Sequence, residues 1–110
     1  MLDEVAAAAD VIAIGTLRAL PEGRAIKRGR PGRAVLLYRE GETVRAFKAY
    51  CTHHGMELME NGIDGCRVTC LQHGWRFELP DGRSAQGERW GLRELAVRIE
   101  DGRFEVLWEE

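Results

Sequence analysis

Apolar and polar positions alternate with a period of two over much of the chain, which is typical of β-strands. The segment RAVLLYREGETVRAFKAY, residues 33–50, holds two runs of β-branched and aromatic residues that are joined around Glu40-Gly41. Two such runs separated by a glycine-containing turn predict a β-hairpin.

A second hairpin is predicted at the end of the chain. Val97 and Ile99 alternate with charged residues, and Asp101-Gly102 then supplies a type I′ turn. The returning strand places three large apolar residues on one face, namely Phe104, Val106 and Trp108.

Turn signals recur between the other apolar runs and leave little room for helices. They are Pro21-Glu22-Gly23, Arg30-Pro31-Gly32, Asn61-Gly62, Asp64-Gly65 and Pro80-Asp81-Gly82. Residues 3–10, DEVAAAAD, are the exception, because their alanines could support one or two helical turns. We therefore expect one all-β domain over residues 1–110, an antiparallel sandwich or barrel without repeats or linkers.

Composition limits the classes of function. A chain of 110 residues can bury about 60 to 70% of its unfolded surface and needs no disulfides for a core. Its net charge of −2 offers no basic field for nucleic acid. The longest apolar run, residues 5–15, is interrupted by Asp10, is too short to span a bilayer and lacks a basic leader. We expect no membrane partner, and cytoplasmic localisation.

The three cysteines and three histidines gather almost entirely in two stretches, CTHHGM at residues 51–56 and CLQHGW at residues 70–75. An odd cysteine count without a secretory signal argues against disulfides. Each stretch offers one thiolate and one imidazole, as Cys51-x-His53 and Cys70-x-x-His73. A single zinc ion could use these four ligands, but zinc pairs usually come as Cys-x₂₋₄-Cys and His-x₃₋₅-His. A binuclear cluster explains better why each stretch gives one ligand of each kind.

The motif CTHHG is followed by CLQHGW, with sixteen residues between His53 and Cys70, and this pattern resembles the Rieske [2Fe–2S] signature. The likeness continues through PEGRAIKRG, RAFKAYCTHHG and CRVTCLQHGWRFELPDG, and so covers most of the chain. The sequence is similar to the small Rieske-type ferredoxins of bacterial ring-hydroxylating oxygenases. It is also similar to the Rieske domains inside the oxygenases themselves.

This resemblance implies a ligand set and a fold. Cys51 and Cys70 would bind one iron of a single [2Fe–2S] cluster, and His53 and His73 would bind the other iron, nearer the surface. The fold would be a Rieske-type antiparallel β sandwich or barrel. A small cluster-binding subdomain, at about residues 48–80, would be inserted between its strands.

Departures from the high-potential Rieske proteins of respiratory complexes indicate the redox range. Those proteins carry a disulfide between the two loops and a serine after the second His-Gly, whereas Met56, Leu71 and Trp75 occupy these places here. Fewer hydrogen bonds would then stabilise added electron density. We expect a potential at the low end of the Rieske range of about −150 to +300 mV.

The resemblance implies a soluble, monomeric one-electron carrier rather than an enzyme. It would take electrons from an NAD(P)H-dependent flavoprotein reductase and pass them to a terminal ring-hydroxylating oxygenase of aromatic hydrocarbon catabolism, with both partners docking transiently near His53 and His73. One alternative is the small Rieske-like subunit of an assimilatory nitrite reductase, against which the four intact ligands count. A zinc-binding interaction module is an alternative from another class.

Several neighbours of the ligands are assigned simpler roles. His54 is expected on the surface, and Cys66 is expected as a small, partly buried residue on the strand approaching Cys70. Gly55 and Gly74 follow the ligands, where the chain needs a positive φ or close approach to sulfide.

The apolar residues near the predicted ligands allow more than one role. Met56 and Leu58 are assigned either to an apolar collar for partners or to packing under the loop. Trp75 and Phe77 alternate and are expected in the core. The family's proline-containing third loop has no counterpart after Pro80, so residues 83–93, with Trp90, must shield the cluster in another way.

Overall fold

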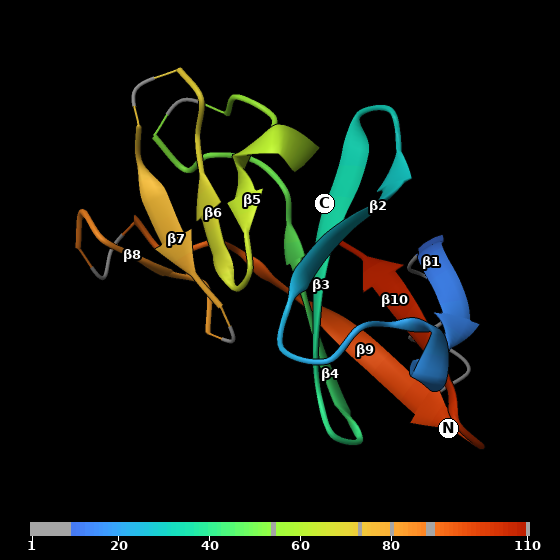
Figure 1. Cartoon of the computed structure of the whole chain (residues 1–110). Coiled ribbons are helices and arrows are strands. Elements are labelled where there is room, and N and C mark those ends of the chain that lie inside the picture. Colours follow the sequence, from blue (N-terminus) through green and yellow to red (C-terminus); the bar gives the residue numbers. More distant parts are fainter. Residues whose placement is uncertain (1–9, 54, 73, 80, 88–89, 110) are drawn as a thin grey trace.

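The computed structural model describes residues 10–53, 55–72, 74–79, 81–87 and 90–109, and within these ranges ten strands form two antiparallel sheets (Figure 1). The larger sheet has the order β1-β10-β9-β4-β3-β2, with bounds β1 Asp10–Thr16, β2 Ala25–Arg30, β3 Arg33–Glu40, β4 Thr43–Lys48, β9 Glu94–Glu100 and β10 Arg103–Trp108. The smaller has the order β5-β6-β7-β8, with bounds β5 Ile63–Asp64, β6 Arg67–Thr69, β7 Arg76–Glu78 and β8 Arg83–Ser84. Two 3₁₀ turns, η1 (Leu17–Ala19) and η2 (Glu60–Gly62), lie in the connections. The all-β antiparallel prediction is confirmed.

Both predicted hairpins are present. β9 and β10 pair from Glu100 opposite Arg103, and Asp101 and Gly102 between them have φ values of 54° and 75°. Positive φ at both central residues is the requirement of a type I′ turn. The other hairpin joins β3 to β4 at Gly41 and Glu42, one residue later than predicted.

The predicted helical turns over residues 3–10 lie almost wholly outside the described residues, since the described chain begins at Asp10. Asp10 itself opens β1. Among the described residues, no helix is long and apolar enough to cross a membrane.

Strand β3 is buried on both of its faces, which explains its continuous apolar run AVLLY. Val35 and Leu37 belong to a core inside the larger sheet, together with Ile12, Val44, Ala46, Leu95, Phe104, Val106 and Trp108. Ala34, Leu36 and Tyr38 belong to a second core between the two sheets, together with Phe47, Ala49, Cys51, Leu58, Val68, Cys70, Phe77 and Leu79. Both predicted cysteine ligands therefore lie in the core that joins the sheets.

The larger sheet curves into an incomplete barrel whose edge strands are β1 and β2. Side chains cross the seam between these edges. Arg33 forms an ion pair with Asp10, and Arg30 Nη2 donates a hydrogen bond of 3.4 Å to the Val11 carbonyl. The barrel is thus closed by side chains where backbone pairing ends.

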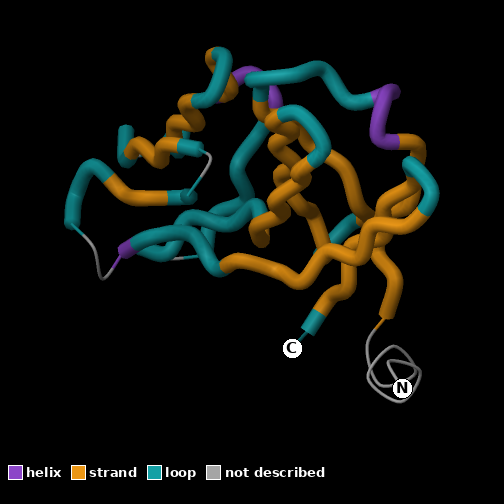
Figure 2. Tube along the Cα trace, turned by 90° about the horizontal axis from the view of Figure 1, so that it is seen from below, coloured by secondary structure: helices purple, strands orange, loops and turns teal. Residues whose placement is uncertain are grey.

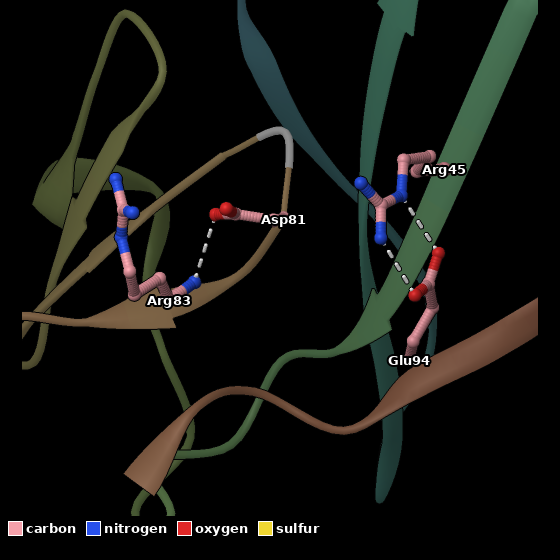
Figure 3. A network of polar contacts seen from close by, with 4 residues as sticks. All are labelled: Arg45, Asp81, Arg83 and Glu94. Carbon is pink, nitrogen blue, oxygen red and sulfur yellow. Dashed lines mark hydrogen bonds and ion pairs between the residues drawn. The ribbon is translucent and has the colours of Figure 1, made fainter. Parts of the chain in front are cut away.

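The smaller sheet is inserted between β4 and β9 and stands beside the barrel (Figure 2). It continues to Ser84 in β8, past the boundary of about residue 80 that the resemblance implies. At the base of the insertion Arg45 on β4 makes two hydrogen bonds of 2.8 Å to Glu94 on β9 (Figure 3). These bonds raise the pKa of the Arg45 guanidinium above its ordinary value. This ion pair reinforces the two residue pairs that join β4 to β9.

Gly82 holds the end of the insertion tightly against the larger sheet. It has a φ of 73°, and a Cβ atom there would lie 2.8 Å from Cε2 of Phe47 and 3.3 Å from Cβ of Leu92. The turn before β8 is further shaped by Asp81, whose Oδ1 accepts a 3.2 Å hydrogen bond from the Arg83 N–H. Asp81 and Gly82 lie in the predicted turn, and Pro80 lies outside the described residues.

We predict that Gly82→Ala destabilises the protein more than Gly32→Ala does. Both glycines have positive φ, at 73° and 79°, but nothing lies within 4 Å of a Cβ at Gly32. The backbone strain of about 1–2 kcal/mol is common to both variants. Overpacking against Phe47 adds about 1–3 kcal/mol at Gly82 alone. Urea denaturation followed by circular dichroism measures the difference, and equal losses of unfolding free energy would contradict the tight contact.

Candidate metal centre

The two cysteine-containing loops share one backbone geometry. In residues 51–56, the Cys51 N–H donates to the Met56 carbonyl at 2.8 Å, and the Gly55 N–H donates to the Cys51 carbonyl at 2.7 Å. In residues 70–75, the corresponding hydrogen bonds run from Cys70 to Trp75 at 2.7 Å and from Gly74 to Cys70 at 2.9 Å. Each loop is therefore a six-residue turn that is closed from its cysteine.

Gly55 and Gly74 supply the conformation that closes these turns. Their φ values are 78° and 75°, in the left-handed region where side chains are strained. A Cβ at either position would meet no protein atom within 4 Å, so backbone conformation, and not contact with other protein atoms, explains the glycines. Of the two reasons expected for these glycines, positive φ is observed at both positions.

The two predicted thiol ligands point into the protein. Cys51 and Cys70 are each 1% exposed, in the core between the sheets. The three cysteines, all of them among the described residues, are not joined by disulfides. Two cysteines buried in the same apolar core are donors that suit a soft metal centre, because iron and zinc both accept thiolates.

His53 lies at the surface instead, in contrast to the buried Cys51 of the same loop. Its ring stacks on Trp75 with 4.3 Å between centroids and 7° between planes. Trp90 meets His53 edge to face at 6.4 Å and 87°, and meets Trp75 at 5.3 Å and 81°. The imidazole of His53, a predicted ligand, and two indoles thus form one cluster of three aromatic rings.

This cluster refines one expectation. Phe77 is fully buried, as predicted, and Trp75 is half-buried: it packs against the core between the sheets and also stacks on His53. Trp75 belongs to the closed turn and not to the strand, because β7 begins at Arg76.

Residues 83–93 approach the centre through Trp90. The Trp90 carbonyl accepts a hydrogen bond of 2.5 Å from the hydroxyl of Thr52, which stands between Cys51 and His53. This contact brings the segment to the first cysteine-containing loop, and shielding of the centre by residues 83–93 stays a prediction. Neither Thr52 nor the ring contact of Trp90 could be found from the sequence, because 38 positions separate the two residues.

The predictions for two of the three histidines are not tested by the structure. His73, the fourth predicted ligand, and His54, predicted to be exposed, lie outside the described residues. Within the described part of the chain, no three His, Cys, Asp or Glu side chains lie close enough together to hold one metal ion. The complete ligand set therefore stays a prediction.

Cys66 stands apart from the other two thiols. It is half-buried in the turn that precedes β6, and its carbonyl accepts a 2.8 Å hydrogen bond from the Leu79 N–H. Partial burial is as predicted, although the residue lies before the strand and not on it. Burial raises the pKa of the neighbouring Tyr38 hydroxyl, and the charges of Glu40 and Cys66 raise it further.

An apolar patch, which we define as Met56, Met59 and Leu71, covers the outer side of the two loops. Their exposed fractions are 43%, 46% and 54%, and together with Glu57 and Gln72 they line a shallow surface depression. Leu58, the other proposed member of an apolar collar, is fully buried.

Lys27 on β2 borders the patch, because its Nζ lies 2.5 Å from Glu57 and 3.7 Å from the Met59 sulfur. Met59 and Leu71 were missed as surface residues because the sequence alone does not show which apolar side chains face outward.

Comparisons with known proteins agree with this geometry. The chloroplastic protein TIC 55 of Arabidopsis thaliana is 40% identical over 47 residues, 42% of this chain, but the chain spans only 9% of that relative's length. Among solved structures, the ferredoxin of carbazole 1,9a-dioxygenase from Nocardioides aromaticivorans IC177 matches with a TM-score of 0.65 and 23% identity, over 92% of this chain and 98% of that one.

Two further structures share the fold in other settings. A quaternary ammonium Rieske monooxygenase in complex with gamma-butyrobetaine matches with a TM-score of 0.73 and 24% identity, over 99% of this chain and 35% of that one. A protein named as the small subunit of an NADPH nitrite reductase matches at 0.60 and 19%, over 90% and 99% of the two chains. At these identities the likeness shows the fold alone.

The family model for the Rieske [2Fe-2S] domain matches residues 10–92, which include the inter-sheet core, both closed turns and Trp90. The chain belongs to the Rieske [2Fe–2S] domain family, whose domain binds a [2Fe–2S] cluster.

Proposed function

We propose that this protein is a one-electron carrier in which Cys51 and Cys70 bind one iron of the cluster and His53 and His73 bind the other. The contrast in burial carries the proposal, because both thiols are 1% exposed while His53 lies at the surface. Such a centre keeps its charged thiolates away from water and presents a neutral imidazole to a partner. The donor set fits a Rieske cluster, with one cysteine and one histidine in each loop.

When bound, the cluster supplies reversible one-electron chemistry. The chain's own residues hold and shelter it. The two closed turns fix the direction of each thiol, and Leu58, Val68 and Phe77 exclude water from the buried side. With His53 and His73 used as ligands, one histidine remains in the sequence, too few for the two-histidine iron site of a whole oxygenase.

The proposed partners are an NAD(P)H-dependent flavoprotein reductase and a terminal ring-hydroxylating oxygenase of aromatic catabolism. Support comes from the ferredoxin of carbazole 1,9a-dioxygenase, which this chain matches over nearly the full length of both. We place docking of both partners near His53 and His73, on the apolar patch of Met56, Met59 and Leu71. A monomeric, cytoplasmic carrier suits such transient contacts, which bury less than about 1,200 Å².

A nitrite reductase small subunit is the second candidate, because the match to such a protein also covers both chains almost completely. The four cluster ligands present in the sequence count against a purely structural role. The zinc module is the weakest of the three interpretations, since the family to which the chain belongs binds a [2Fe–2S] cluster.

The proposed potential lies at the low end of the Rieske range. Met56 and Leu71 stand where a disulfide would brace the loops, and Trp75 stands where a serine hydroxyl would reach a cluster sulfur. Met56 and Leu71 are exposed apolar side chains and give the cluster no hydrogen bond. A low potential suits electrons that come from NAD(P)H through a flavin.

A reconstituted electron-transfer chain tests the function. We expect the anaerobically purified protein to be brown and paramagnetic when reduced, and to relay electrons from NADH through a dioxygenase-type flavoprotein reductase to cytochrome c. A colourless protein that contains one zinc ion would overturn the iron–sulfur assignment. A brown protein that accepts no electrons from such reductases, but purifies in a fixed complex with a nitrite reductase, would favour the second candidate.

The ligand assignment predicts a change of potential in His73→Cys. A charged thiolate would replace a neutral imidazole, which should lower the midpoint potential by about 100 mV or more, toward that of all-cysteine ferredoxins. Spectroelectrochemical titration measures the shift. His54→Ala is the matched control, because we assign no iron to His54, and its absorption spectrum and potential should match the wild type. A normal cluster spectrum in His73→Ala would contradict the assignment.

The docking assignment predicts that Leu71→Ser weakens transfer through the relay. Loss of one large apolar contact costs about 1 kcal/mol or more, so the KM of the reductase for this protein should rise about three- to tenfold with little change in kcat. Ile99→Ser is the control, because Ile99 is also exposed, at 41%, but lies on β9 away from the apolar patch. Equal effects of the two substitutions would argue against docking on the patch.

A further inference from the structure

We propose that Trp90 is a positioning residue that packs against one side of the exposed His53 ring and holds the cluster potential down by reducing the access of water to that side. The inference rests on the proposed function in one respect, namely that His53 binds iron. It assigns to residues 83–93 the shielding that a proline-containing loop gives elsewhere in the family.

The geometry makes Trp90 the second aromatic neighbour of the His53 imidazole. Trp75 covers one face of His53 in a parallel stack at 4.3 Å, and the Trp90 ring stands at 87° to the His53 plane. The two indoles also contact each other edge to face at 5.3 Å. Aromatic pairs in such arrangements contribute about 0.5–1.5 kcal/mol each beyond the burial of area, so the rings hold one another in place.

Backbone contacts fix Trp90 independently of its ring. Its carbonyl accepts the Thr52 hydroxyl at 2.5 Å, and its N–H donates to the Gly87 carbonyl at 3.1 Å. Two residues later, the Leu92 N–H donates to Gly82 at 2.8 Å, and the Leu92 side chain is buried. The segment is therefore anchored to the first cysteine-containing loop through Thr52 and to the turn before β8 through Gly82.

The direction in which Trp90 shifts the midpoint potential follows from the charge of the centre. A centre with two thiolate and two neutral imidazole ligands is uncharged when oxidised and gains one negative charge on reduction. Water beside the ligand rings stabilises that charge more than the carbon atoms of an indole do. Trp90 therefore disfavours the reduced state, and its removal should raise the midpoint potential.

The test compares Trp90→Ala, Trp90→Leu and Trp90→Phe as cluster-loaded proteins. At the wild-type midpoint potential, the ratio of reduced to oxidised protein should rise about three- to tenfold in Trp90→Ala, the equivalent of one hydrogen bond from water. Trp90→Leu should shift less, and Trp90→Phe should remain close to the wild type because it keeps an aromatic wall. Pulsed paramagnetic resonance in deuterated water should report more exchangeable deuterons near the reduced centre in the same order.

Ala85→Ser is the control, since Ala85 is an exposed, uncharged residue of the same segment, and its potential should not move. If the alanine variant does not fold, the order of Trp90→Leu and Trp90→Phe decides the matter. Unchanged potentials in loaded Trp90 variants, or a fall in potential, would overturn the inference. Failure of the proposed function looks different, because the wild type itself would then lack the spectrum of the cluster.

Discussion

The metal centre depends on one backbone interaction that occurs twice, the hydrogen bond from a cysteine N–H to the carbonyl five residues later. In both loops this bond leaves the cysteine in the core between the sheets and lifts the following residues to the surface. Burial of Cys51 and Cys70, and exposure of His53 and Leu71, are two results of the same turn. The rest of the fold supplies a floor beneath the turns, built mainly by Leu36, Leu58, Val68 and Phe77.

Strand β3 explains how a small chain supports both a barrel and a second sheet. Its alternate residues enter two different cores, so one strand serves as a shared wall. The inserted sheet has short strands of two or three residues and would be marginal alone. Packing against Leu36 and Phe47, together with the tight contact at Gly82, gives it a rigid base. The match to 35% of a monooxygenase chain is consistent with the same module standing within a longer protein.

Much of this arrangement could be predicted from local sequence, because hairpins and closed turns are short-range structures. Asp101-Gly102 specifies its turn through positive φ at both residues, and the spacing of the cysteines and histidines indicates the two loops. Contacts made between distant segments could not be predicted. The position of Trp90 over His53 and the outward direction of Leu71 depend on packing across the insertion, which periodicity does not encode. Trp75 packs against the core as predicted, but its stacking on His53 was not predicted, for the related reason that one residue decides whether a side chain belongs to a turn or to the strand after it.

The three-ring cluster of His53, Trp75 and Trp90 also bears on the rate of electron exchange. Under the proposed assignment of His53 as a ligand, an imidazole that contacts two indoles, on a turn closed by its own backbone, has few torsions left that can relax when the charge of the centre changes. Little internal rearrangement then accompanies the arrival or departure of an electron. In the proposed carrier, the pace of exchange would be set by how closely a partner approaches and how long it stays, and a donor and an acceptor could be served in turn without a change of shape.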